Sequence, residues 1–522
     1  MRFLLALAFA LPLFAQDHPT GARAVDKIFD RFHRRDSPGC AVGVMAGDTQ
    51  VLAAAYGMAD LEHNVPLVPD SVFEPGSVTK QFTAAAVLLL AQDGKLSLDD
   101  PVRKYIPELP DYGTPITIRH LLNHTSGLRD WGNEESIVGW PRTSREYTHA
   151  HVLDILSRQR ALNYPPGAEY SYTNSGYNLA AILVARVSSE SLPAFTRRTI
   201  FAPLGMTSTQ WRDDFRRIVK DRAIAYSQSG GTFRQDMPFE DVYGNGGLLT
   251  TVGDLLRWNR NFVTMQVGGP QLVQDQQTRG KLTDGRTIAY AAGLMMLHWK
   301  GMAEVSHSGS TAGYSAWLGR YPEQKTSVAV LCNLAGVNAT QLGHQVADVY
   351  LGTTARQNAA PKPAKVDAAT LAARAGLYRS MRDHHTITVG AQERPANADG
   401  PQREFETDAS GKVVRMKVVT EIDPNNTYEK VEPAHPTAGD LAAMAGTYTS
   451  DEAELTLKVE LESGKLVIHR RPDATFALTP TYRDGFSSSL GSIRFLRDAA
   501  GQITELSVGD ARVWDLRFER VR

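Results

Sequence analysis

The pattern of apolar residues changes once along this chain of 522 residues, and that change limits the folds open to it. From about residue 22 to 352, runs typical of strands alternate with runs typical of helices. After about residue 366, short alternating β patterns are separated by turn residues. Residues 353–366 between the two parts, rich in alanine, proline and lysine, are typical of a linker. Since one hydrophobic core rarely serves a chain this long, we expect separate domains.

Five strand-like runs lie near the two ends of the first domain. Two of them, 40–46 and 50–57, flank a Gly47-Asp48 turn, and the others lie near 304–309, 315–321 and 327–332. The long segment between these groups is helical and rich in loops. We therefore predict an α/β (α+β) fold for residues 22–352, with an antiparallel five-stranded sheet flanked by helices and an inserted helical subdomain.

The C-terminal part contains an imperfect duplication. The segment Leu371–Tyr378 is similar to Leu441–Tyr448. The segments that begin at Phe405 and Phe495 are also similar, but the spacing between them is about twenty residues longer. The second copy is therefore longer by roughly two strands and a turn. The alternating patterns need closure to hide their strand edges. We therefore expect a shortened β repeat over 367–433 and a lipocalin-like antiparallel β-barrel over 437–522.

The N-terminus has the pattern of an export signal. Arg2 precedes an apolar run from Phe3 to Phe14, and Ala15 offers a small residue for cleavage. The run is too short to cross a bilayer as a stable helix, and no later segment is apolar enough to do so. The sequence predicts a signal peptide over 1–15 and a periplasmic or secreted protein without a transmembrane segment after cleavage.

Charge and composition exclude some partners and leave others open. The formal net charge is -1, and no block of like charge marks nucleic acid as a partner. His120 and His124 lie four residues apart, but without an acidic partner for a zinc site we expect a structural role. We expect neither a metal nor a cofactor, and a small-molecule or peptide substrate; the oligomeric state is left open.

The clearest candidate for chemistry is a Ser-x-x-Lys motif formed by Ser77 and Lys80. It opens a mostly apolar stretch that extends to Gln92 and is typical of a central, buried helix. The spacing puts the lysine amine one turn from the serine hydroxyl on the same helix face. A buried lysine can lose its proton well below its reference pKa of about 10.4, so it could activate the serine as a nucleophile.

The Ser-x-x-Lys motif alone is weak evidence for catalysis, and two further motifs strengthen it. Tyr172 and Asn174 follow a turn-rich segment that would present them from a loop. His307, Gly309 and Ser310 end a predicted strand, where the glycine lets a ligand lie against the strand edge and the Ser310 N–H could join that of Ser77 in an oxyanion hole.

In this order, the three motifs resemble those of the serine β-lactamase and D,D-peptidase superfamily of penicillin-recognising serine hydrolases. The resemblance covers roughly 22–351 and includes the framework-like runs 73–83, 121–128 and 246–255. It implies an acyl-enzyme formed on Ser77, with Lys80 and Tyr172 sharing proton transfer. It also implies that Asn174 orients the substrate amide and that His307 lines the opposite wall.

Chemical reasoning adds two expectations to this resemblance. A cationic Lys80 would ease deprotonation of Tyr172, which could then return a proton to the leaving group. A mostly neutral His307 in place of the lysine of typical β-lactamases would attract a substrate carboxylate less than an ammonium group does. The resemblance is therefore to the D,D-peptidase, D-aminopeptidase or family VIII carboxylesterase branches rather than to true β-lactamases. A catalytically weak penicillin-binding or sensor protein is the alternative.

The two cysteines, Cys40 and Cys332, both lie in apolar, strand-like stretches. This context favours inert thiols in the core over a single disulfide, although an exported chain permits either. In a sheet like that of the family, the first strand neighbours the last in antiparallel direction. The resemblance therefore implies that the two cysteines lie close together.

Overall fold

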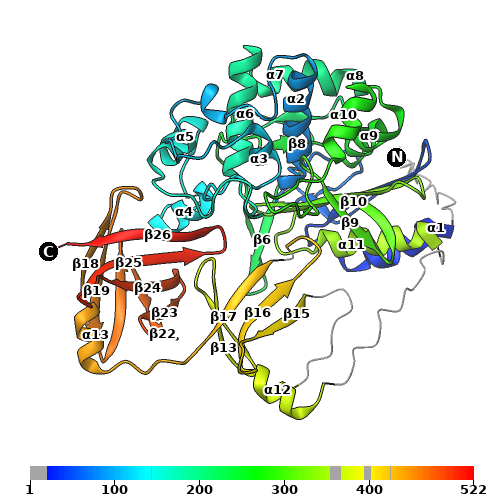
Figure 1. The fold of residues 1–522 in the computed structure, drawn as a ribbon. Coiled ribbons are helices and arrows are strands. Elements are labelled where there is room, and N and C mark those ends of the chain that lie inside the picture. The colour runs from blue at the N-terminus through cyan, green and yellow to red at the C-terminus, as the bar shows by residue number, and fades with distance from the viewer. Residues whose placement is uncertain (1–19, 143, 353–365, 393–400, 424, 522) are drawn as a thin grey trace, which may run out of the picture.

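The computed structural model describes residues 20–142, 144–352, 366–392, 401–423 and 425–521. The expected signal peptide and residues 353–365 of the expected linker lie outside these ranges. The described chain forms a domain of sheet and helices, a small yellow β-sheet and an orange-to-red barrel (Figure 1). The predicted fold class, α/β with antiparallel sheets followed by a barrel-like β part, is confirmed.

The main sheet is antiparallel throughout and has six strands, one more than expected. Its order is β2 (Thr49–Tyr56), β1 (Cys40–Ala46), β12 (Thr326–Cys332), β11 (Tyr314–Tyr321), β10 (Met302–Thr311) and β9 (Met295–Trp299). The extra strand, β9, lies at the edge beside β10. Its sequence, Met-Met-Leu-His-Trp, shows no regular alternation of apolar and polar residues, so the pattern does not distinguish a strand from a helix.

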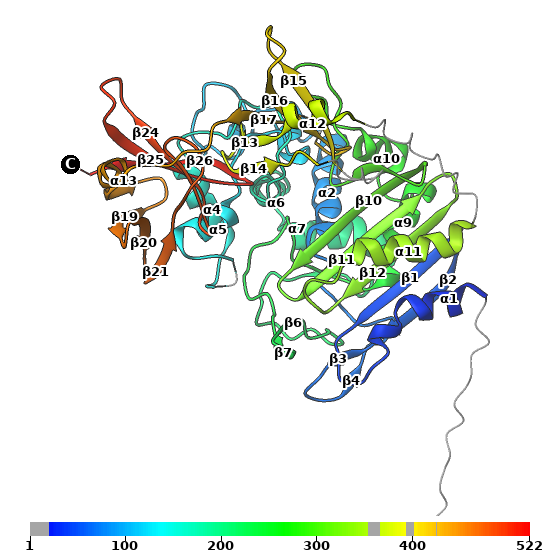
Figure 2. The same cartoon turned by 90° about the horizontal axis from the view of Figure 1, so that it is seen from below.

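Both faces of this sheet are covered, so strand β1 is apolar along nearly its whole length. Val42 and Val44 pack in the core under α1 (Thr20–Ile28) and α11 (Ala339–Leu351). On the other face, Gly43 approaches Leu256 of α9 (Val252–Thr264) so closely that an added Cβ would lie 2.9 Å from its Cδ1. Figure 2 shows α1 and α11 together on one side of the sheet. The sheet is therefore the middle of three layers.

The second face carries the helical subdomain, built around α2 (Lys80–Gln92). Ten of the thirteen residues of α2 are buried, which confirms the expected central helix. A short 3₁₀ turn, Gly76–Thr79, precedes it, so Ser77 lies in this turn and Lys80 is the first residue of the α-helix. The neighbouring helices are α3 (Ile118–Leu122), α4 (Trp131–Val138), α5 (His149–Arg158), α6 (Ser175–Ser188), α7 (Leu192–Thr196), α8 (Ala202–Leu204) and α10 (Gly269–Gln277).

Among the described residues, no single helix is long and apolar enough to span a membrane. One bent pair, Ser175–Ser188 with Leu192–Leu204, passes on length and composition when taken together. Most of α6 is buried in the core of the helical subdomain.

The first C-terminal unit is a five-stranded antiparallel sheet preceded by α12 (Ala368–Arg374). Its strand order is β14 (Thr386–Val389), β13 (Gly376–Ser380), β17 (Asn426–Val431), β16 (Val413–Val419) and β15 (Gln402–Thr407). Its core is small and centres on Tyr378, Met416 and Tyr428.

The second unit, preceded by α13 (Ala438–Met444), is a nine-stranded antiparallel sheet curled into a nearly closed barrel. Its order is β21 (Ala474–Ala477), β20 (Lys465–Arg470), β19 (Leu455–Glu462), β18 (Gly446–Ser450), β26 (Val513–Arg520), β25 (Ile503–Asp510), β24 (Gly491–Arg497), β23 (Gly485–Ser488) and β22 (Thr479–Pro480). The two outer strands, β21 and β22, are not paired with each other. They are consecutive segments of the chain joined at Leu478, so the chain itself connects the two edges.

Equivalent hydrogen bonds occur at corresponding positions of the two units. The hydroxyl groups of Tyr378 and Tyr448 each donate at 2.7 Å to the carbonyl four residues earlier, at Arg374 and Met444. The turns at 408–411 and 498–501 close with the same Gly N–H to Asp C=O bond at 3.0 Å. The strand order of the first unit matches β19-β18-β26-β25-β24 of the second. The second copy has four short strands, β20 to β23, without a counterpart among the described strands of the first. The offset in the sequence had suggested two.

The barrel is fastened to the first domain through α4. Ile137 and Val138, at the end of α4, are buried in the barrel's own hydrophobic core. Just before the start of α4, Arg129 forms a buried ion pair with Glu452 and donates a 2.7 Å hydrogen bond to the backbone carbonyl of Asp515. Figure 1 shows α4 directly against β26. The barrel therefore shares a core with the domain that precedes it.

The two cysteines lie at facing positions of neighbouring strands. Strand β1 pairs with β12 in antiparallel direction, and Cys40 is in register with Cys332. Their Cα atoms lie 4.0 Å apart and the sulfur atoms form a disulfide. The expected proximity is confirmed. The preference for free thiols is wrong, because the pairing of two distant strands brings both buried side chains to one point.

Candidate active site

A cavity of about 440 Å³ lies where the 3₁₀ turn before α2, the loop before α6 and the end of β10 meet. Six of the seven site residues expected from the sequence line it, and the seventh, Lys80, contacts the lining residues Ser77 and Asn174. The lining residues are Gly76, Ser77, Arg142, Tyr172, Asn174, Asn245, Gly246, Met295, His307, Ser308, Gly309, Ser310, Thr311 and Arg512. All seven expected residues are therefore brought together by the fold.

Ser77 and Lys80 form the centre of the site. A 3₁₀ turn has three residues per turn, so side chains at i and i+3 stand directly above one another. Lys80 Nζ lies 3.0 Å from Ser77 Oγ, 3.0 Å from Asn174 Oδ1 and 2.8 Å from the backbone oxygen of Asn245. The amide and carbonyl oxygens can only accept hydrogen bonds. A neutral amine has two N–H groups for these two oxygens, which leaves its lone pair directed at the Ser77 hydroxyl.

The surroundings of Lys80 favour the neutral amine. Burial lowers its pKa well below 10.5, and the positive charges of Arg512 and Arg142 lower it further. The carboxylate of Asp130 acts in the opposite direction and raises the pKa, but the lowering influences prevail. The lysine side chain is fully buried. Lys80 is therefore placed to accept a proton from Ser77.

The ring of Tyr172 lies beside the Lys80 amine. Lys80 Nζ is 4.8 Å from the centre of its ring. Burial raises the pKa of Tyr172 above its usual value, although Ser77 and the charge of Arg512 lower it in part. The hydroxyl is buried and makes no regular hydrogen bond to the described residues. The pKa of Tyr172 is thus raised, whereas the sequence predicted easier deprotonation, because the effect of burial is larger than that of the neighbouring charge.

Asn174 and Asn245 are held by a second layer of buried polar groups. The carboxylate of Asp130 accepts a 2.6 Å hydrogen bond from the Asn174 backbone N–H. The side chain of Asn178 donates at 2.7 Å to Asn245 Oδ1. Trp131 Nε1 donates in turn at 2.9 Å to Asn178 Oδ1. This chain of contacts fixes the two oxygens that bind Lys80.

His307 is a neutral imidazole of defined tautomer. Its Nδ1 lies 2.6 Å from the backbone oxygen of Ser308, which can only accept, so Nδ1 carries the proton. Its Nε2 then accepts from the hydroxyl of Tyr290 at 3.1 Å. Burial is the main cause that lowers the pKa of His307 to about 3, and Lys80 adds to it when its amine is protonated. His307 therefore lines the cavity with a lowered pKa.

The glycines at the edge of β10 allow two backbone segments to meet. A Cβ on Gly309 would lie 2.0 Å from the carbonyl oxygen of Pro75 and 2.7 Å from the nitrogen of Ser77. A Cβ on Gly76 would lie 2.5 Å from the nitrogen of Ser310. Gly309 therefore allows the turn that carries Ser77 to approach strand β10 closely. Ser77 N and Ser310 N belong to the two segments that touch.

His124 has the structural role expected for it. It is fully buried, and its Nδ1 accepts the Thr173 backbone N–H at 3.2 Å. Its ring packs against Tyr172 at 4.2 Å and Tyr290 at 4.5 Å between ring centres. His120 closes a capping box with Thr117 at the start of α3. His124 therefore helps to position Tyr172.

Sequence reasoning missed four residues of this site. Asn245 directly precedes the Gly246-Gly247 run that resembled the family framework, so its neighbourhood gave a signal. Tyr290 and Arg142 occur in stretches without a recognisable motif. Arg512 belongs to another domain, more than four hundred residues along the chain from Ser77, and no local pattern connects the two.

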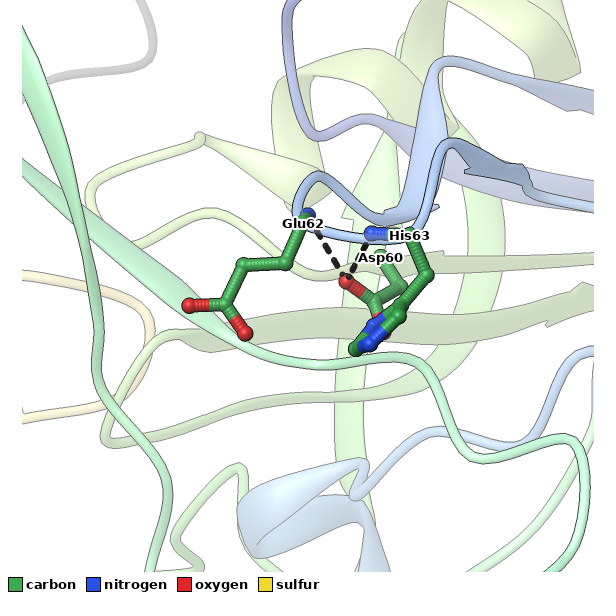
Figure 3. Close-up of side chains that lie close together, drawn as sticks. All are labelled: Asp60, Glu62 and His63. Carbon is green, nitrogen blue, oxygen red and sulfur yellow. Dashed lines mark hydrogen bonds and ion pairs between the residues drawn. The ribbon is translucent and has the colours of Figure 1, made fainter.

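Among the residues that the structure describes, two groups of side chains with metal-ligand chemistry lie outside the cavity. One consists of Asp60, Glu62 and His63, shown in Figure 3, and the other of Glu460, Glu462 and His469. In the first group, Asp60 Oδ1 accepts the backbone N–H groups of Glu62 and His63, as in an ordinary turn. His63 and Glu62 are exposed. These groups are explained by turn and strand contacts and are not part of the candidate site.

Comparison with known proteins gives consistent matches. The Beta-lactamase family model matches residues 25–351. The chain is 29% identical over 301 residues to Penicillin-binding protein 4* of Bacillus subtilis (strain 168), which covers 53% of this chain and 64% of that protein. It is 25% identical over 508 residues to a D-aminopeptidase of Brucella melitensis biotype 2, which covers 90% of this chain and 93% of the relative. The chain thus spans less than two thirds of the length of the first relative.

A solved structure shares the fold. The octameric penicillin-binding protein homologue from Pyrococcus abyssi superimposes with a TM-score of 0.58 at 23% sequence identity. The match covers 88% of this chain and 100% of that one. The likeness therefore extends beyond the sheet and helices into the C-terminal β units.

Proposed function

Because this chain belongs to the Beta-lactamase family of serine hydrolases, we propose that it hydrolyses amide or peptide bonds of small substrates through an acyl-enzyme on Ser77. The observation that carries this proposal is the set of contacts around Lys80 Nζ. Two oxygens that can only accept hydrogen bonds, on Asn174 and Asn245, take its N–H groups, and the Ser77 hydroxyl lies 3.0 Å away. This arrangement prepares a lone pair for proton transfer.

In the first step, Lys80 takes the hydroxyl proton as Ser77 Oγ attacks the substrate carbonyl. The backbone N–H groups of Ser77 and Ser310 stabilise the oxyanion of the tetrahedral intermediate. Tyr172, kept protonated by its raised pKa, gives its proton to the leaving amine and recovers one from the Lys80 ammonium. Water then cleaves the ester by the reverse sequence and releases the acid product.

The proposed substrate class is supported by the similar proteins and by the chemistry of His307 at the wall of the cavity. A relative that covers 90% of this chain is a D-aminopeptidase, which supports amide substrates and the D configuration. Carboxylesterase and D,D-peptidase activities use the same acyl-enzyme and are tested beside it. The neutral His307 supports a peptidase or amidase more than a β-lactamase.

We also propose that the protein is exported to the periplasm or beyond. The apolar N-terminal run supports this, and so does the disulfide between Cys40 and Cys332, because disulfides persist in oxidising compartments. Expression of the full chain with an N-terminal sequence determination of the mature protein tests the export and locates the cleavage point.

The decisive experiment compares wild type, Ser77→Ala and the exposed-serine control Ser229→Ala. A fluorescent phosphonate should label wild type and the control but not Ser77→Ala. A panel of D-amino-acid amides, D-Ala-D-Ala peptides, short-chain esters and a cephalosporin should show steady turnover that Ser77→Ala loses. Equal labelling of all three proteins would defeat the proposal. A stoichiometric burst without turnover would instead identify a penicillin-binding sensor.

A further inference from the structure

The active-site cavity is completed by a residue of the C-terminal barrel, Arg512. It occupies the two-residue turn between β25 and β26 and lines the same cavity as Ser77. Its backbone carbonyl accepts the N–H of Asp130 at 3.3 Å and the side-chain amide of Asn163 at 3.0 Å. Asn133 donates at 2.6 Å to Asp510, on the other side of the turn. The tip of the barrel is therefore held in a fixed position at the cavity.

The guanidinium of Arg512 is available to a ligand. It lies 4.9 Å from the centre of the Tyr172 ring and 3.7 Å from Asp130 Oδ2, beyond hydrogen-bonding distance. The Asp130 carboxylate already accepts the N–H groups of Gly132, Asn133 and Asn174. Within the described residues the guanidinium makes no hydrogen bond, and 37% of the side chain is exposed.

The other basic groups at the cavity are committed elsewhere. Lys80 is surrounded by Ser77 and two accepting oxygens. Arg142 donates through Nε and Nη2 to the two carboxylate oxygens of Glu240. His307 is neutral, with one nitrogen bonded to a carbonyl and the other to a hydroxyl. Among the described residues at this cavity, Arg512 is therefore the cation whose guanidinium donates no hydrogen bond to the protein, although it lies 3.7 Å from Asp130.

We propose that Arg512 binds a carboxylate of the substrate, so that the enzyme prefers amides or peptides that carry a carboxylate beside the scissile bond. The planar guanidinium offers paired N–H donors that match the two oxygens of a carboxylate. The same charge disfavours a substrate with a free ammonium at that place. This inference rests on the proposed function and refines it, because it separates a carboxypeptidase-like specificity from an aminopeptidase-like one.

The test uses three D-alanine substrates that differ in charge. The first, N-acetyl-D-Ala-D-Ala, carries a free carboxylate. The second, its derivative with an amidated C-terminus, is neutral. The third, the same amide without the acetyl group, carries an ammonium. A fourth substrate, with its carboxylate on a D-Glu side chain and the C-terminus amidated, distinguishes the two sources of a carboxylate. Because loss of Arg512 also raises the pKa of Lys80 for every substrate, the ratio of kcat/KM values between substrates is the quantity compared.

In wild type, kcat/KM should be highest for a carboxylate substrate. Arg512→Gln should lower kcat/KM for that substrate about 10- to 100-fold relative to the neutral amide, as expected for loss of a charged hydrogen bond. Arg512→Lys should retain part of the preference. Arg512→Glu should reverse it in favour of the ammonium substrate. Arg483→Gln, at an exposed site on the same barrel, is the matched control and should match wild type.

Unchanged substrate ratios in Arg512→Gln and Arg512→Glu would overturn the inference while leaving the proposed function intact. The two failures can be distinguished. If wild type neither turns over any substrate nor reacts with the phosphonate at Ser77, the proposed function itself fails. Fluorescence or urea unfolding of each variant confirms that the barrel remains docked.

Discussion

Glu134 is a fully buried carboxyl group in α4, near the surface that joins the first domain to the barrel. Its Oε2 has no hydrogen-bond partner among the described residues. Burial, together with the charge of Glu452, raises the pKa of Glu134 from 4.5 to about 8, although Arg129 lowers it in part. The folded protein therefore keeps a proton on Glu134 that the unfolded chain releases near pH 4.5.

The sign of the resulting pH dependence follows from this difference. Between pH 4.5 and 8 the folded state binds one proton more than the unfolded state, so stability falls as the pH rises. Each pH unit in this range costs about 1.4 kcal/mol. The contribution of Glu134 to the free energy of unfolding therefore falls by about 3 to 4 kcal/mol between pH 5 and pH 8. Glu134→Gln has nearly the same shape and no charge, so it should be more stable than wild type at pH 8.

The assay is urea unfolding of wild type, Glu134→Gln and the exposed-carboxyl control Glu404→Gln at pH 5, 6, 7 and 8. The stability gained in Glu134→Gln should grow with pH by the amount given above, while the control should follow wild type. A gain that is independent of pH, or a loss of stability at pH 8, would refute the reasoning. Such a result would mean that Glu134 is ionised in the folded protein and stabilised by Arg129.

Three further results are expected. The value of kcat/KM should fall as the pH drops through the Lys80 pKa, because an ammonium cannot accept the serine proton; an acid limb at or above pH 10.5 would contradict the lowered pKa. The double variant Cys40→Ala/Cys332→Ala should lose about 2 to 4 kcal/mol of stability in urea, and an unchanged midpoint would argue against the disulfide. Tyr290→Phe should cost about 1 to 3 kcal/mol, since buried His307 Nε2 loses its donor; no loss in urea unfolding would contradict that bond.

Local spacing made much of the site predictable. Ser77 and Lys80 are three residues apart, so any helical turn brings them together, and Tyr172 and Asn174 share one loop. The order of these motifs then indicated the fold around them. The pairing of the first strand with the last also followed, and it placed Cys40 opposite Cys332.

The features that the sequence did not predict depend on contacts between distant segments of the chain. Strand β9 has no alternation of apolar and polar residues, because it lies at a sheet edge with partly buried side chains on both faces. The pKa of Tyr172 depends on how deeply the finished fold buries it, which a motif does not encode. Arg512 has an ordinary place in a β-turn, and its role arises from where the barrel is attached.

The attachment of the barrel through Ile137 and Val138 limits how this chain can be divided. A protein cut in the linker would leave two apolar side chains of α4 facing water and would strip the barrel interior of the same two. Neither half would be a finished unit. Exchange of barrels between relatives should therefore succeed only when the end of α4 is exchanged along with the barrel that encloses it.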